Sequence, residues 1–110
     1  MTLVEREYRR DGWSVHDVSS QNLGWDLTAT RARTVQHLEV KGVSGVRPTI
    51  LLTRDERDTA ANDPSWLLVV VTQALTAPAV SRFDAAEVLR CCSPQLYRVA
   101  LPQNHTGGER

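Results

Sequence analysis

Three polar residues of this sequence stand at a spacing that could support phosphate chemistry: Asp26, Glu39 and Lys41. Glu39 and Lys41 are two positions apart, so their side chains would project from the same face of a β-strand. Two carboxylates held close together repel each other unless a cation lies between them, and hard ions such as Mg²⁺ prefer oxygen ligands. An ammonium group beside them could hold a water molecule or stabilise charge that develops on a phosphate.

Lys41 is the only lysine in the chain, and the other twelve of the 13 basic side chains are arginine. A guanidinium stays protonated above about pH 12 and cannot act as a base, whereas the pKa of a lysine ammonium moves readily when the group is partly buried. Lys41 is therefore a candidate catalytic residue. The competing interpretation is a surface ion pair between Glu39 and Lys41, which would contribute little to stability.

Two predicted strands would position these residues. The runs "WDLTATRA" (residues 25–32) and "TVQHLEVKG" (34–42) are strand-like and meet around residues 31–34, which predicts a β-hairpin. With that turn, Asp26 lies roughly opposite Glu39, where cross-strand side chains come within about 5 Å. The backbone carbonyl of Val40 could supply a further metal ligand. His37 shares the face of Glu39 and Lys41, and we expect it to be a structural or rim residue.

Helix and strand signals complete an α/β order. Apolar residues at helical spacing predict a helix over residues 2–10, and "WSVHDVS" (13–19) predicts a strand. "ILLT" (50–53) predicts a brief strand or an extended lead-in. The sequence Thr53-x-x-Glu56 matches a capping box, which predicts a helix that runs to about residue 62.

The C-terminal third predicts further elements. The apolar run "SWLLVVVTQAL" (65–75) is typical of a strand covered on both faces at the centre of the sheet. A short helix capped at Ser81 and a final edge strand in "QLYRVALP" (95–102) are expected after it. Three tryptophans are predicted to pack in the core or at its rim: Trp13, Trp25 and Trp66.

Composition indicates one domain over residues 1–110, with a formal net charge of zero that gives no global sign of a nucleic-acid or membrane partner. The longest apolar run (66–71) is too short to cross a bilayer and no apolar signal core is evident, so we expect a cytoplasmic protein. Cys91 and Cys92 are adjacent, where a mutual disulfide would be strained, and we expect reduced, partly buried thiols.

The pattern Gly24-Trp25-Asp26 followed by Glu39-Val40-Lys41-Gly42 resembles the D…ExK core of the PD-(D/E)xK superfamily. More narrowly, "GWSVHDVSSQNLGWDL", "HLEVKG" and "LTRDE" with Ala60 resemble the domain family named after the C-terminus of the plant protein NO VEIN, over about residues 4–75. The resemblance implies a restriction-endonuclease-like α/β core, with a mixed central sheet flanked by helices in the order α-β-β-β-α-β.

The same resemblance implies a Mg²⁺-dependent DNA endonuclease in a restriction or phage-defence context, with Mn²⁺ as a substitute. Asp26, Glu39 and the Val40 carbonyl would bind the metal ion, and Lys41 would position water or steady the attacked phosphate. Many members of the superfamily add an acidic residue from the first helix, a role that Glu5 could fill.

Four arginines are candidates for contact with a DNA backbone. They are Arg9 on the basic side of the first helix, Arg31 and Arg33 in the hairpin turn, and Arg47 in the glycine loop. A solvated charged face would explain the helix equally well. The expected partners are DNA and a second copy of the chain or a larger defence complex, without a membrane.

Two other functions remain open at this stage. One is a catalytically inactive module of the nuclease fold that binds nucleic acid or a protein. The other is a small α/β adaptor in which Glu39 and Lys41 form only an ion pair.

Overall fold

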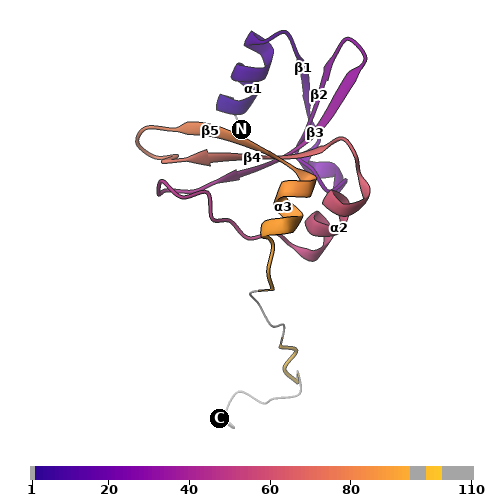
Figure 1. Ribbon diagram of the computed structural model, residues 1–110, viewed down its shortest axis with the longest axis vertical. Helices are drawn as coiled ribbons and strands as arrows, with labels where there is room; N and C mark the ends of the chain where they lie inside the picture. The colour runs from indigo at the N-terminus through magenta and orange to yellow at the C-terminus, as the bar shows by residue number, and fades with distance from the viewer. Residues whose placement is uncertain (1, 95–98, 103–110) are drawn as a thin grey trace.

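A mixed β-sheet organises the computed structural model, which describes residues 2–94 and 99–102 (Figure 1). Within these residues the chain forms five strands, three α-helices and one 3₁₀ helix. Their bounds in chain order are α1 Thr2–Arg10, β1 Ser14–Asp17, η1 Ser19–Gln21, β2 Leu27–Arg31, β3 Thr34–Gly42, α2 Arg54–Asn62, β4 Trp66–Thr72, β5 Ala79–Asp84 and α3 Ala85–Cys91. The predicted order α-β-β-β-α-β is confirmed and is followed by β5 and α3.

The strands lie in the order β1-β2-β3-β4-β5, so β3 is the central strand and β4 lies second from an edge. The prediction that residues 65–75 form the centre is therefore wrong, although β4 is buried on both faces along most of its length. β3 and β4 are parallel, whereas the other neighbouring strands are antiparallel. A parallel pair needs a crossover connection, and α2 supplies it.

The β2–β3 hairpin has the register that the sequence predicts, with Arg31 opposite Thr34 and Leu27 opposite Leu38. Asp26 lies just outside β2. Its backbone N–H donates to the carbonyl of Leu38 at 2.7 Å, so Asp26 and Leu27 both face Leu38. Two residues against one is the geometry of a β-bulge, which redirects the side chain of the extra residue. Asp26 therefore faces Leu38 and not Glu39, the residue that the prediction places roughly opposite it.

Helices cover both faces of the sheet (Figure 1). On one face, Val4 and Tyr8 of α1 join a buried cluster that contains Leu38. On the other face, Ala60 of α2 and Val88 of α3 join a second buried cluster, whose sheet residues are Trp66, Leu68 and Val70. Because side chains alternate along a strand, Glu39 and Lys41 lie on the face opposite to Leu38, beneath α2.

The region after β4 differs from prediction. Ser81 does not cap a helix, because it lies within β5 and pairs with Val70. The N-cap of α3 is Asp84, whose side chain accepts a hydrogen bond from the N–H of Glu87 at 2.8 Å. Cys91 and Cys92 are free thiols as expected, but they are exposed rather than partly buried.

Two further predictions concern short extended segments. "ILLT" is an extended lead-in to α2 and forms no strand. The predicted edge strand 95–102 falls partly outside the described residues, and residues 99–102 have no regular structure. In the part of the chain that the structure describes, no helix is long and apolar enough to cross a lipid bilayer.

Candidate functional site

A cavity of about 260 Å³ lies where the loop before β2 meets β3 and the first turn of α2. Four acidic residues are among those that line it: Asp26, Glu39, Asp55 and Glu56. The lysine Lys41 reaches two of these carboxylates, as described below. The cavity therefore concentrates ionisable groups on the sheet face that α2 covers.

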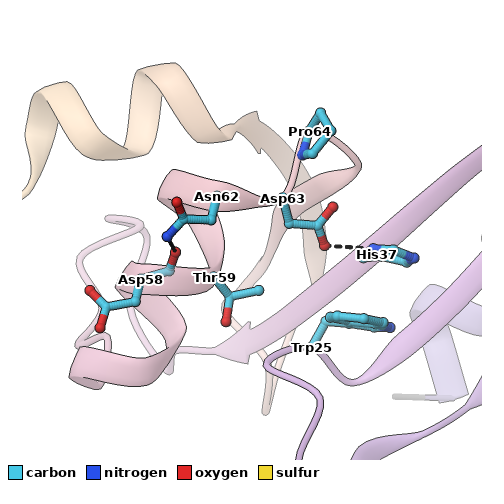
Figure 2. Close-up of a pocket in the computed structure, with 7 residues that line it drawn as sticks. All are labelled: Trp25, His37, Asp58, Thr59, Asn62, Asp63 and Pro64. Carbon is cyan, nitrogen blue, oxygen red and sulfur yellow. Dashed lines mark hydrogen bonds and ion pairs between the residues drawn. The ribbon is translucent and has the colours of Figure 1, made fainter.

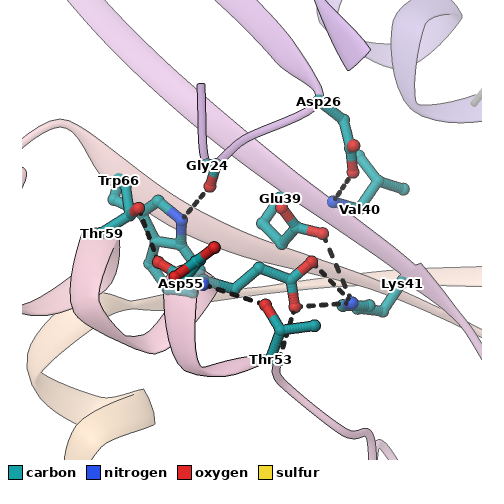
Figure 3. A network of polar contacts seen from close by, with 10 residues as sticks. Gly24, Asp26, Glu39, Val40, Lys41, Thr53, Asp55, Thr59 and Trp66 are labelled. Carbon is teal, nitrogen blue, oxygen red and sulfur yellow. Dashed lines mark hydrogen bonds and ion pairs between the residues drawn. The ribbon is translucent and has the colours of Figure 1, made fainter. Parts of the chain in front are cut away.

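Asp26 is held against the backbone of β3. Its carboxylate Oδ2 accepts a hydrogen bond from the N–H of Val40 at 2.9 Å (Figure 3). The N–H of His37 donates to Ser65 at the start of β4, on the other side of β3. Since backbone groups alternate in direction along a strand, the carbonyl of Val40 also points toward the side where Asp26 lies.

Glu39 is almost completely buried, with 4% of its surface exposed. Burial and the negative charges of Asp26 and Glu56 together raise the pKa of this carboxyl to about 8, against the opposing charge of Lys41. A buried carboxyl beside two other acids is the arrangement that makes its charged form costly. Such perturbed groups occur at functional sites more often than elsewhere.

Lys41 contacts two carboxylates at once (Figure 3). Its Nζ donates to both oxygens of Glu56, at 3.0 and 3.2 Å, and lies 3.5 Å from Oε2 of Glu39. Burial lowers the pKa of Lys41, but the hydrogen bond and charge of Glu56 and the charge of Glu39 outweigh burial, so the pKa is raised. The ammonium is therefore held in its charged form.

Glu56 is the residue of this cluster that sequence reasoning missed, because it was assigned only a capping role. The capping box itself is confirmed: the N–H of Glu56 donates to Oγ1 of Thr53, and Oε1 of Glu56 accepts from the N–H of Thr53. Burial raises the pKa of Glu56, but the Thr53 and Lys41 hydrogen bonds outweigh it and lower the pKa. The available signal was topological, since a helix that follows a parallel strand begins near the end of that strand.

The structure does not bring the other predicted site residues to this cavity. Glu5 lies on α1, over the opposite face of the sheet, with Oε2 3.7 Å from Nη2 of Arg9. Arg9 also donates to the carbonyl of Val15 at 3.0 Å. Arg31 lies five residues along β2 from Asp26, which is about 17 Å in an extended strand.

The remaining two arginines are exposed. Arg33 lies in the turn between β2 and β3, at the far end of the hairpin from Asp26. Arg47 lies in the loop that follows β3. Of the four predicted arginines, Arg47 is the one whose segment leads from β3 directly toward the first turn of α2.

A second, open depression of about 530 Å³ lies beside the cavity and shares Trp25 with it (Figure 2). The Trp25 and His37 rings stack at 3.9 Å with an interplanar angle of 11°. Nδ1 of His37 lies 2.6 Å from Oδ2 of Asp63, at the end of α2. These contacts give His37, on β3, structural partners in the loop before β2 and at the end of α2.

The donor set suits a hard divalent cation. Carboxylate and carbonyl oxygens are what Mg²⁺ and Mn²⁺ prefer, and the charge crowding at Glu39 is of the kind that a divalent cation relieves. Among the described residues, no group of three or more His, Cys, Asp or Glu side chains is arranged as a ready metal site. Asp26 and Glu39 with the Val40 carbonyl are therefore the residues that would hold such an ion.

Comparison with known families gives one match. The family model for "Protein NO VEIN, C-terminal" matches residues 1–83, which is most of the 110-residue chain. This range contains every residue of the acidic cavity and ends within β5. Neither a curated protein nor a solved structure matches the chain significantly.

Proposed function

The chain belongs to the family of the C-terminal domain of protein NO VEIN, and from this premise we propose that it is a metal-dependent nuclease domain. The proposed reaction is hydrolysis of phosphodiester bonds in DNA, on a restriction-endonuclease-like fold of the PD-(D/E)xK superfamily. The observation that carries the proposal is the meeting of Asp26 and Glu39 at one cavity, with the ammonium of Lys41 3.5 Å from Glu39. A mixed five-stranded sheet with helices on both faces supports the fold assignment.

Each of the three residues has a distinct role in the proposed site. Asp26 and Glu39, with the Val40 carbonyl, bind Mg²⁺ or Mn²⁺ through oxygen atoms. The ion supplies Lewis-acid polarisation of the phosphate and acidifies water at neutral pH. Lys41 places a positive charge where negative charge develops on the phosphate, in a partly buried setting where that charge acts strongly.

The proposed partners follow from the same assignment. DNA is the substrate. Of the four arginines proposed for contact with its backbone, Arg47 lies in the loop that leads from β3 toward α2. A second copy of the chain, or a larger restriction or antiviral complex, would supply the surface for sequence recognition that a 110-residue chain has little room for. We also propose that the protein acts in the cytoplasm.

A second candidate is a catalytically inactive module of the same fold that binds nucleic acid or a protein. The contacts of Lys41 favour it, because an ammonium 3.0 Å from Glu56 and 3.5 Å from Glu39 offsets one of the two negative charges without a metal ion. In that case the Glu39, Lys41 and Glu56 network would serve to fix α2 on the sheet.

The test is cleavage of plasmid and single-stranded DNA in the presence of Mg²⁺ or Mn²⁺. We expect Glu39→Ala and Lys41→Ala each to lose at least about 100-fold in rate, as removal of a group that stabilises the transition state does. Glu7→Ala is the matched control, because Glu7 lies on α1 and pairs with Arg82 at 3.6 Å. Its rate should equal that of the wild type.

Two results would contradict the proposal in different ways. Cleavage that survives both Glu39→Ala and Lys41→Ala would show that the site is elsewhere. A folded wild type that binds Mn²⁺ in calorimetry but cleaves neither DNA form would favour the inactive module.

A further inference from the structure

Lys41 contacts Glu56 more closely than it contacts Glu39, and this difference has a structural cause. Nζ meets both oxygens of Glu56 at 3.0 and 3.2 Å but a single oxygen of Glu39 at 3.5 Å. Glu56 is therefore the closer partner and uses its whole carboxylate. A lysine side chain has many rotamers, so one ammonium position persists only when a partner fixes it.

The side chain of Glu56 is itself held in place by contacts other than the one with Lys41. Its Oε1 accepts from the N–H of Thr53 at 2.9 Å, and its own N–H donates to Oγ1 of Thr53 at 3.1 Å. Residues in the first turn of a helix also lie near the positive end of its dipole, which favours a carboxylate there. The capping box thus presents a preorganised anion to the sheet.

The helix that carries Glu56 is anchored about one turn after this contact. Ala60 is buried against the sheet, and Gly24 lies so close to Thr59 that an added Cβ would stand 2.2 Å from Oγ1. α2 therefore has little freedom to move away from the cavity. The position of the Glu56 carboxylate relative to β3 is set by packing rather than by the ion pair alone.

We propose that Glu56 is a positioning residue, which fixes the ammonium of Lys41 beside Glu39 through its two-oxygen contact. This inference rests on the proposed nuclease function, since it assigns Glu56 to the placement of the proposed catalytic lysine. It also gives Glu56 a second role beside helix capping.

The chain offers an unusually clean measurement, because Lys41 is its only lysine. Protein labelled with ¹³C-lysine gives side-chain signals from one residue, and relaxation of its Cε group reports how strongly the side chain is ordered. In Glu56→Gln we expect the order parameter of Lys41 Cε to fall at least twofold. Glutamine preserves the capping box, in which either Glu or Gln is suitable, so the helix start is retained.

Two further variants test whether the order of Lys41 depends on the carboxylate of Glu56. Glu7→Gln is the matched control, because it makes the same substitution in the ion pair with Arg82 on the opposite face, and it should leave the Lys41 signal unchanged. Glu56→Asp keeps the charge but withdraws the carboxylate by one methylene, and we expect an intermediate order parameter. A Lys41 side chain that stays as ordered in both Glu56 variants as in the wild type would overturn the proposal.

Cleavage kinetics give the second readout. We expect kcat of Glu56→Gln to fall about 10- to 100-fold with little change in KM, because a displaced catalytic group costs rate more than binding. The two proposals can fail separately. Loss of Lys41 order in a protein that never cleaves DNA would support the positioning contact and contradict the nuclease, whereas unchanged order and unchanged kcat would contradict the role of Glu56 alone.

Discussion

Glu39 shows how one residue can be costly for the fold and useful for chemistry. It stands at the centre of the sheet on β3, with 4% of its surface exposed, between Asp26 and Glu56. An ionised Glu39 loses its hydration and is repelled by the charges of Asp26 and Glu56, and Lys41 offsets only part of this cost. A hydrophobic residue would stabilise the centre of a sheet better, so the retained carboxyl favours a function for this position.

The burial of Glu39 predicts a pH dependence of stability in metal-free protein. Its pKa is about 8 in the folded chain and near the ordinary value of 4.5 in the unfolded chain. Between these values the folded state keeps a proton that the unfolded state has lost. The free energy of unfolding should therefore fall as pH rises from about 5 to 8, by up to about 1.4 kcal/mol per pH unit.

Urea unfolding in a chelating buffer measures this effect at several pH values. Glu39→Gln removes the ionisable group and should abolish the slope that Glu39 contributes, so the variant becomes relatively more stable as pH rises. Parallel slopes for the wild type and Glu39→Gln would show that the folded protein does not hold this proton.

At the scale of elements, the loop before β2 and the helix α2 form one unit. The carbonyl of Gly24 accepts a hydrogen bond from Nε1 of Trp66 at 3.2 Å, and Gly24 has a φ of +96°. A side chain is strained at this φ and would also overlap Thr59. The loop that carries Asp26 therefore reaches α2 only because residue 24 is glycine.

This contact predicts a large effect of a single methyl group. Gly24→Ala should lower the free energy of unfolding by about 1–3 kcal/mol, because the backbone is strained and the new Cβ meets the helix. Gly45→Ala is the matched control, since an added Cβ there meets nothing within 4 Å. Thermal or urea unfolding of the two variants compares them directly, and equal stabilities would contradict the close approach.

Local sequence signals predicted the elements near the cavity well and those near the C-terminus poorly. Thr53 and Glu56 carry a capping box, and the turn at residues 31–34 fixes a register, so both signals lie within a few residues. Ser81 failed as a cap because pairing with β4 extends the chain there, and this contact joins distant segments. The central place of β3 rather than β4 likewise depends on strand order, which no local pattern encodes.

The residues of the candidate site also differ in how far local sequence signals predict them. Asp26, Glu39 and Lys41 could be found because strand alternation and a hairpin relate them. Glu56 has no local signal of this kind, because its approach to Lys41 depends on where the crossover helix lies on the sheet. The bulge at Asp26 was also hidden, since it arises from backbone pairing with Leu38.

At the scale of the whole molecule, Arg31 and Arg82 join its layers. Arg31 donates to the carbonyl of Asp11 at 3.0 Å and lies 4.6 Å from the centre of the Trp13 ring. Arg82 contacts Tyr8 and Glu7 of α1 in the same manner. These contacts tie α1 to the sheet, so part of the arginine content has a structural role.

Arg31 and Arg33 therefore predict different consequences when they are replaced. Arg31→Ala should lower the free energy of unfolding by about 1–2 kcal/mol, through the lost hydrogen bond and cation–π contact. Arg33→Ala, at an exposed turn position two residues away, should change it by less than about 0.5 kcal/mol. Unfolding curves measure both, and an equal effect of the two substitutions would contradict the tie between α1 and the hairpin.

The short crossover through α2 has a consequence for how the molecule folds. Two of the contacts at the cavity join residues 14 and 15 positions apart, from Asp26 to Val40 and from Lys41 to Glu56. The contact of Arg82 with Tyr8 spans 74 positions. Because closure of a short loop costs less chain entropy, the cavity can form while the two ends of the chain are still unstructured. The residues proposed for chemistry thus belong to the segment whose native contacts are kinetically easiest to make.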